Sequence, residues 1–220
     1  MRRALARLGA CVVLALVAVC GSAAISMRPA DRAFTPPDYE SVYRAWTREG
    51  DQFAFGKLAD VLNVTATFQS WEFRRAYVVR YAEDFSLVND ERDTMLASSL
   101  EDARHQHRFF VTLAGHNFRE SDLTSERSAW RVLLVTADGR HVAPSAIERV
   151  KRPTPAEKRY FPSISPFRQT FRISFDVQDA TGKATVGEDA AYVVLRFTGV
   201  QGTEDLRWSF EPPGGAPRRR

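Results

Sequence analysis

The residues best suited to chemistry in this sequence form a short cluster around two histidines. His105 and His107 are two positions apart, and alternate residues of a β-strand share a face, so both imidazoles could bind one divalent ion. Glu101, Asp102 and His116 lie nearby in the sequence. On a helix, Glu101 and His105 would instead be neighbours, and a histidine near a helix C-terminus interacts favourably with the helix dipole. A metal site at His105 and His107, completed by Glu101 or His116, is therefore one hypothesis.

Other catalytic patterns are missing from the sequence. Nucleophilic catalysis needs a nucleophile, a base and an orienting group in mutual reach. There is no Gly-x-Ser-x-Gly motif, and the two cysteines both lie within the first 24 residues. The acidic run from Asp84 to Asp93 lacks the spacing of an EF-hand loop, and the glycines are scattered rather than gathered into a phosphate-binding loop. We predict no catalytic residues and no cofactor, and favour a non-catalytic protein over a periplasmic metal-dependent hydrolase that uses His105 and His107.

Residues 1–24 have the pattern of an export signal. Three arginines precede an apolar run from Leu8 to Cys20, and small residues follow as far as Ala24. The apolar run is too short to span a bilayer comfortably as a permanent helix. Cleavage after Ala24 would satisfy the small-x-small rule of signal peptidase, and the mature chain would then begin at Ile25.

A second processing route depends on Cys20. The residues Val17-Ala18-Val19-Cys20 form an aliphatic residue, two further residues and a cysteine. This pattern resembles the lipobox of bacterial exported lipoproteins, many of them uncharacterised, although it departs from that motif at Val19, where Gly, Ala or Ser is usual. The resemblance implies lipidation of Cys20 and membrane attachment through an N-terminal lipid, and it implies no activity. Both an N-terminus at Cys20 and one at Ile25 remain open.

The remaining composition describes an ordinary exported domain. Because both cysteines, Cys11 and Cys20, lie in the signal region, the mature domain has no internal disulfide. The formal charge of +4 is misleading, since six of the arginines lie in residues 1–24 and 212–220 and the chain between them is nearly neutral. A neutral domain argues against nucleic-acid binding. The preference for arginine over lysine favours a bacterial source.

The pattern of apolar residues predicts short strands and a few helices. Leu62, Val64, Ala66 and Phe68 alternate with polar residues, which is typical of a strand with one buried face. Ser70 is a cap for a following helix, and Asp138-Gly139 is a type I′ hairpin signal. The expected elements are a helix at 39–48, a turn-rich segment at 50–56, a helical pair within 71–104, strands at 62–69, 108–114, 130–136, 140–143, 171–176, 192–197 and 206–210, and an irregular crossing at 144–166.

These elements predict a mainly β fold, namely an antiparallel immunoglobulin-like β-sandwich with an inserted helical pair packed on one edge or end. Along the chain we expect a signal peptide at 1–24 (or a lipoprotein signal that ends before Cys20), a disordered tether at 25–38, the sandwich domain at 39–211 with its helical insertion at about 71–104, and a disordered basic tail at 212–220. We interpret the aromatic residues as core, whereas an exposed group at Trp71, Phe73 and Tyr77 would mark a ligand surface.

The functional expectation follows from export and from the lack of catalytic spacing. We expect a non-catalytic binding or scaffold module of the bacterial cell envelope, either lipid-anchored or periplasmic. Its partner would be an envelope protein or ligand of unknown identity, with the membrane as a second partner if Cys20 is acylated, and without nucleic acid.

Overall fold

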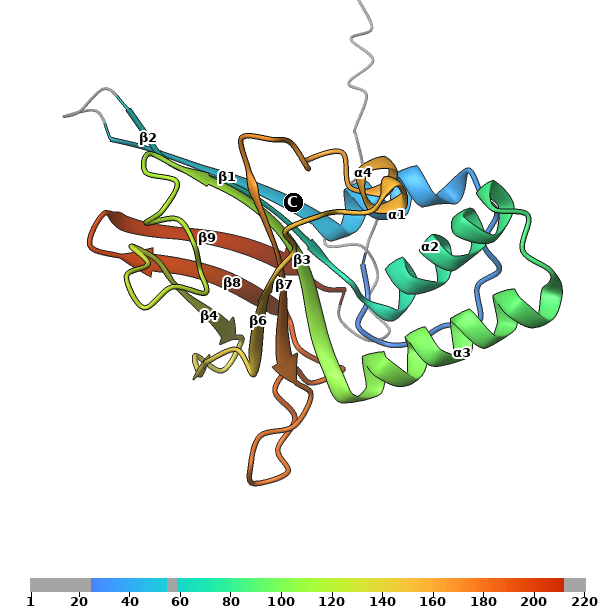
Figure 1. The fold of residues 1–220 in the computed structure, drawn as a ribbon. Helices are drawn as coiled ribbons and strands as arrows, with labels where there is room; N and C mark the ends of the chain where they lie inside the picture. Colours follow the sequence, from blue (N-terminus) through green and yellow to red (C-terminus); the bar gives the residue numbers. More distant parts are fainter. Residues whose placement is uncertain (1–24, 55–58, 212–220) are drawn as a thin grey trace, which may run out of the picture.

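Two antiparallel β-sheets and four helices make up the residues that the computed structural model describes, 25–54 and 59–211. Figure 1 shows the two sheets at one end of the molecule and the helices gathered toward the other. The expectation of a mainly β, antiparallel, sandwich-like fold is confirmed at this level.

Sheet A has five strands in the spatial order β1-β2-β3-β7-β6, and every neighbouring pair is antiparallel. Its strands are β1 (Thr47–Ala54), β2 (Ala59–Phe68), β3 (Gln106–Gly115), β6 (Ala146–Arg149) and β7 (Gln169–Asp176).

Sheet B has four strands in the order β5-β4-β8-β9, again antiparallel throughout. Its strands are β4 (Arg131–Thr136), β5 (His141–Val142), β8 (Tyr192–Gly199) and β9 (Gly202–Ser209). The hairpin predicted at Asp138-Gly139 joins β4 to β5, but its turn is not type I′: that type needs a positive φ at both central residues, and of the two only Gly139 has one, at 80°.

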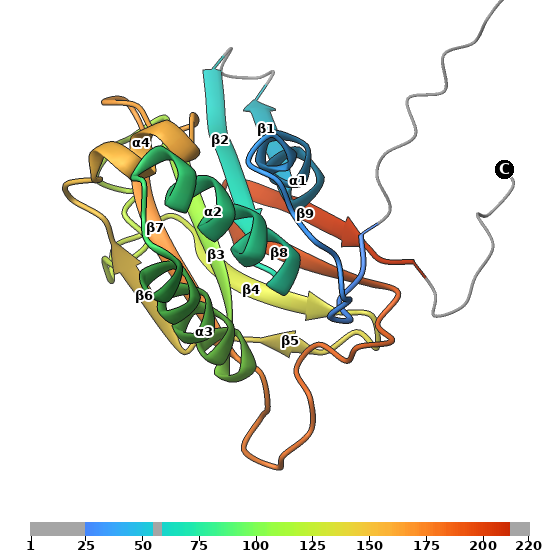
Figure 2. The same ribbon diagram turned by 90° about the vertical axis from the view of Figure 1, so that its right-hand side faces the viewer.

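The helices are α1 (Asp38–Trp46), α2 (Trp71–Asp84), α3 (Asn89–His105) and α4 (Pro155–Tyr160). The predicted helical pair is confirmed: α2 and α3 form a hairpin inserted between β2 and β3, and they lie side by side in Figure 2. As the sequence suggested, α2 begins at a cap, with the Ser70 hydroxyl accepting a hydrogen bond of 3.2 Å from the Phe73 amide.

The core between the sheets is dominated by aromatic rings. Phe68 and Phe109, on the neighbouring strands β2 and β3, stack with ring centroids 4.6 Å apart. Trp208 of β9 lies 5.4 Å from the ring of Phe109, and Trp46 lies 5.5 Å from that of Phe68. All four side chains are at most 1 % exposed. Aromatic rings therefore fill the space where the two sheets face one another, which agrees with their interpretation as core.

Sheet A is also covered on its outer face, which the alternation of β2 did not predict. Thr65 and Thr67 are buried as fully as their apolar neighbours. The segment that follows α4 covers them: Phe161 stacks on Phe110 of β3 with centroids 3.9 Å apart. The Arg168 guanidinium donates to the hydroxyls of Thr65 and Thr112 at 2.8 and 3.1 Å. The strand prediction is confirmed, but the expectation of a single buried face is wrong.

Two local predictions need correction. The turn-rich segment expected at 50–56 begins inside strand β1, whose polar sequence gives no alternating signal. The crossing at 144–166 is not irregular throughout, since it contains β6 and α4. A capping box starts α4: the Thr154 hydroxyl accepts from the Glu157 amide at 3.1 Å, and the Glu157 carboxylate accepts from the Thr154 amide at 2.7 Å.

Residues 25–38, expected to be a disordered tether, pack against the domain instead. Ile25 is 3 % exposed, and its carbonyl accepts a hydrogen bond of 3.0 Å from the Glu211 amide. The Trp71 indole donates to the Ser26 carbonyl at 3.2 Å. The segment is proline-rich, but its apolar side chains find partners on the domain, which offsets the entropy of ordering it.

The close approach of β8 to the segment before β4 gives a test of this architecture. A Cβ atom added at Gly199 would clash with the Ala129 backbone, including its carbonyl carbon at 3.1 Å, whereas one added at Gly187 would meet nothing within 4 Å. Because backbone cannot move aside cheaply, Gly199→Ala should lower the free energy of unfolding by roughly 1–3 kcal/mol. Urea denaturation should show this loss and show Gly187→Ala close to wild type; equal stability of the two variants would contradict the β8 placement.

Candidate functional site

A pocket of about 390 Å³ lies where the α2–α3 hairpin meets the start of β3, and we call it the junction pocket. Four parts of the chain build its walls: the segment before α1, the start of α2, the α3–β3 junction, and the loop between β7 and β8. Its lining residues are Met27, Pro29, Phe68, Gln69, Ser70, Trp71, Arg75, Leu100, Ala103, Arg104, Gln106, His107, Val177, Val186 and Glu188. The wall is mostly apolar, as in most small-molecule sites, and its volume is within their usual range.

His107 belongs to the buried wall of this pocket. The side chain lies on β3 and is only 8 % exposed, with its ring 5.9 Å from that of Phe68 in an edge-on arrangement. Its Nε2 atom has no hydrogen-bond partner within the described residues. Burial, and then the nearby charge of Arg74, lower the pKa of His107 to about 4, so the imidazole is neutral at neutral pH.

Arg75 supplies the second unpartnered polar atom of the pocket. Its Nε–H is buried and makes no hydrogen bond to any described residue. The guanidinium carbon lies 5.9 Å from the ring centroid of Trp71, one turn earlier on α2. Trp71 also holds the segment before α1 through the Ser26 carbonyl, so one indole positions both the arginine and a wall of the pocket.

Unpartnered polar atoms concentrate at this junction. The described residues contain six buried side-chain atoms without a hydrogen-bond partner, and Arg74 Nη2, Arg75 Nε and His107 Nε2 are three of them. An unsatisfied buried polar atom costs about 1–3 kcal/mol. All three atoms have an accessible surface below 1 Å², so a ligand in the pocket cannot bond to them unless neighbouring groups move.

Arg74 faces a second, more polar cleft of about 450 Å³ on the other side of Gln69. Its guanidinium donates to the Asp102 carboxylate at 2.8 Å and to the Ser99 carbonyl at 2.9 Å. Asp102 also pairs with Arg108 at 2.7 Å. These contacts join α2, α3 and β3, so we interpret this cleft as the ion-paired base of the hairpin.

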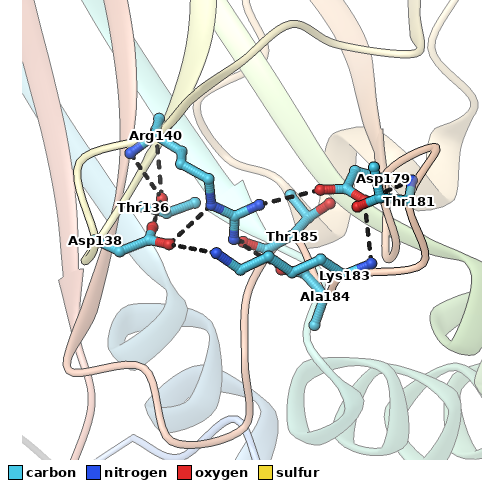
Figure 3. A network of polar contacts seen from close by, with 8 residues as sticks. All are labelled: Thr136, Asp138, Arg140, Asp179, Thr181, Lys183, Ala184 and Thr185. Carbon is cyan, nitrogen blue, oxygen red and sulfur yellow. Dashed lines mark hydrogen bonds and ion pairs between the residues drawn. The ribbon is translucent and has the colours of Figure 1, made fainter.

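The β7–β8 loop carries Val177, Val186 and Glu188 into the junction pocket, and a polar network fixes this loop (Figure 3). Arg140, from the β4–β5 turn, donates to Asp138 at 2.8 Å and to the Ala184 carbonyl at 2.8 Å.

Two carboxylates of this network are committed to nearby donors. The Thr136 hydroxyl, followed by Lys183 and Arg140, holds the pKa of Asp138 well below its usual value. Hydrogen bonds from Thr181 lower the pKa of Asp179, which also contacts Arg140 at 3.4 Å. Because both groups are ionised and occupied by donors, the network positions the loop rather than supplying a general base.

The structure does not bring the predicted metal ligands into one site. His105 ends α3 with its side chain 73 % exposed, 3.1 Å from Glu101 one helical turn earlier, while His107 is buried on β3. His116 is exposed beyond the far end of β3. Among the residues that the structure describes, no group of three or more His, Cys, Asp or Glu is arranged to hold a metal ion. The metal-site hypothesis therefore gains no support.

The aromatic residues singled out in the sequence divide between core and pocket. Phe73 is 2 % exposed and Tyr77 packs against the core, whereas Trp71 lines the junction pocket. Cys20 and the predicted signal, together with the predicted basic tail at 212–220, lie outside the described residues. Within 25–54 and 59–211, no helix has the length and apolar character needed to cross a bilayer.

Comparison with known proteins does not assign the chain to a family. No family model, curated protein or solved structure matches it. The functional argument therefore depends on the geometry of this chain alone.

Sequence reasoning named two residues of the pocket and missed a third. It selected His107, but as a metal ligand beside His105, and it named Trp71 as part of a possible ligand surface while favouring a core role. It did not select Arg75, because a single arginine in a helix carries no pattern. The position of Arg75 one turn after Trp71 is the signal that was present, since aromatic and cationic side chains at this spacing meet on one helix face.

The buried imidazole makes stability depend on pH. Because the pKa of His107 is about 4 in the folded protein and about 6.5 when unfolded, the unfolded chain binds a proton that the folded chain does not. The free energy of unfolding should therefore fall as the pH drops through this interval, by roughly 2–3 kcal/mol from this residue between pH 7.5 and 4.5.

Urea denaturation of variants at those two pH values isolates the contribution. His107→Leu should lose this part of the pH dependence, whereas His105→Gln, which changes an exposed imidazole two residues away, should keep it. An unchanged pH dependence in His107→Leu would show that His107 is not buried in its neutral form.

Proposed function

We propose that this protein is a non-catalytic binding module of the bacterial cell envelope and that the junction pocket is its binding site. The observation that carries the proposal is the coincidence of a mostly apolar pocket with Arg75, a lining residue whose guanidinium forms no ion pair with any described residue. Apolar walls favour an apolar ligand body, and an unpaired guanidinium favours a ligand with a matching polar group.

The hydrolase alternative has no comparable support. Its two histidines lie in different surroundings, one exposed at a helix end and one buried on a strand. Glu101, which would complete the site, is paired with Arg104 at 2.9 Å and with His105. A binding role requires no such convergence of ligands or nucleophiles.

We also propose that the two-sheet core is immunoglobulin-like, and strand order supports this. If β2 to β9 are labelled A, B, C, C′, D, E, F and G, sheet A has the order A-B-E-D and sheet B the order C′-C-F-G. Those are the orders of immunoglobulin-type sandwiches. In this interpretation β1 is an additional edge strand, and the α2–α3 hairpin is inserted between strands A and B. Because this architecture hosts many functions, the proposal concerns the fold and not the ligand.

The envelope location is proposed from the sequence of residues 1–24 and fits the path of the chain that follows. Ile25 is bonded to Glu211, so the two ends of the described chain lie together. If Cys20 carries a lipid, only four residues separate it from Ile25, and an extended chain of that length reaches at most about 18 Å. The domain would then be held close to the membrane surface.

The pocket can be tested with a neutral apolar fluorophore, N-phenyl-1-naphthylamine. The wild-type protein should bind it saturably, with one site per chain, and Ala103→Trp should lower the affinity at least tenfold because the indole fills the pocket. The control is Ala97→Trp, which places the same indole on the exposed side of the same helix. Fluorescence titration that finds no saturable site in the wild-type protein, or equal affinity in both variants, would overturn the proposed site.

Anchoring is tested separately by intact-mass analysis of the protein from the membrane fraction. Lipidation predicts a chain that begins at Cys20 and carries added acyl mass, with Cys20→Ser releasing the protein into the soluble fraction because the acyl chains provide the membrane affinity. A soluble protein that begins at Ile25 would remove the anchor and leave an exported periplasmic module. Full-length protein with Met1 intact in the cytoplasm would contradict export altogether.

A further inference from the structure

We propose that the ligand of the junction pocket is an amphiphile with one carboxylate and an apolar tail, and that the carboxylate pairs with Arg75. This inference rests on the proposed binding function and names the chemical class that the pocket would take. It follows from the hydrogen-bonding capacity of the Arg75 guanidinium, from the charges around the pocket and from the apolar wall.

The hydrogen-bonding argument starts from Arg75. The guanidinium of arginine has donors and no acceptor, so a ligand group that pairs with Arg75 must be an acceptor. Arg75 lines the pocket, and its Nη atoms are not among the buried unpartnered atoms, whereas its Nε atom has almost no accessible surface. A carboxylate offers only acceptors and forms strong charge-assisted bonds with arginine, which makes it the best match for this guanidinium.

The charges around the pocket favour a single negative charge on the ligand. Arg75 and Arg104 line the pocket, but Arg104 is already paired with Glu101 at 2.9 Å. Arg75 forms no ion pair with any residue that the structure describes. Behind the wall, Arg74 and Arg108 share the carboxylate of Asp102. Glu188 is the one acidic residue in the described lining, and it is exposed. Of the two guanidinium groups that line the pocket, only that of Arg75 therefore lacks a carboxylate partner among the described residues, which suits an anionic group on the ligand.

The apolar wall defines the rest of the ligand. The pocket is lined by apolar residues from three separate segments of the chain: Met27 before α1, Leu100 and Ala103 of α3, and Val177 and Val186 of the β7–β8 loop. Val186 is itself 6 % exposed, so the wall is continuous with buried structure. Burial of a hydrocarbon chain against such a wall is favourable roughly in proportion to the apolar area removed from water. The combination of an arginine donor with aliphatic walls favours a fatty-acid-like molecule over a sugar or a peptide.

Decanoate is a suitable probe, and decanol is its neutral counterpart of the same chain length. Isothermal titration calorimetry below the aggregation concentration should show that wild-type protein binds decanoate at least tenfold more tightly than decanol. Arg75→Gln should remove this preference, with a loss of about 10- to 100-fold for decanoate, because a hydrogen bond to a charged group is worth about 1.5–3 kcal/mol. Arg92→Gln is the control, since it removes the same charge from an exposed residue of α3 that pairs with Asp93.

A second readout follows His107 directly. A carboxylate in the pocket favours the protonated imidazole, so bound decanoate should raise the pKa of His107 by one unit or more from its value of about 4, while decanol should not. NMR titration of the imidazole signals measures this shift, with exposed His105 as the internal control. The same measurement in Arg75→Gln separates loss of binding from loss of folding.

The outcomes distinguish this inference from the function on which it rests. If the neutral fluorophore binds and decanoate is not preferred over decanol, or if Arg75→Gln keeps the preference, the carboxylate assignment is wrong and the binding site remains. If neither the fluorophore nor decanoate binds to the wild-type protein, the binding function fails together with the assignment.

Discussion

The indole N–H of Trp208, on β9, donates to the main-chain carbonyl of Trp46 at 2.9 Å, and this buried bond links sheet B to the point where α1 becomes β1 of sheet A. Around it the rings of Trp46, Phe68, Phe109 and Trp208 fill the space between the sheets. The indole needs a partner because an unsatisfied buried donor is costly. The Trp208–Trp46 hydrogen bond and the four rings around it therefore set the place where α1 ends and the distance between the two sheets.

One face of sheet A packs against the aromatic core, and its other face also carries buried side chains that must be covered. The way in which that outer face is covered creates the junction pocket. Phe110 and the buried threonines of β2 and β3 are covered by the segment after α4. The α2–α3 hairpin lies beside this segment, with the ring of Phe73 5.9 Å from that of Phe161, and α3 runs into the start of β3. The space left at that junction is the pocket that Arg75 and His107 line.

Sequence reasoning recovered the elements with strong local signals and missed those fixed by tertiary contacts. Ser70 and the Asp138-Gly139 pair act within a few residues, so α2 and the β4–β5 hairpin were predictable. Strand β1 was not, because Gly50 faces Glu204 and Leu206 of β9 and owes its place to that close approach. For the site, His107 drew notice by residue type, but its burial and its distance from solvent depend on how β3 packs, which spacing alone does not encode.

The packed segment before α1 has a mechanical consequence. Met27 and Pro29 form part of the pocket wall, and they lie just after Ile25, where the chain is clamped against Glu211. A force applied to the chain before Ile25 would therefore act on the hydrogen bond between Ile25 and Glu211 before it acted on Met27 and Pro29. A force strong enough to break the hydrogen bond between Ile25 and Glu211 would also displace Met27 and Pro29 and open the junction pocket. Ligand occupancy of the pocket would then depend on the force applied to the chain before Ile25.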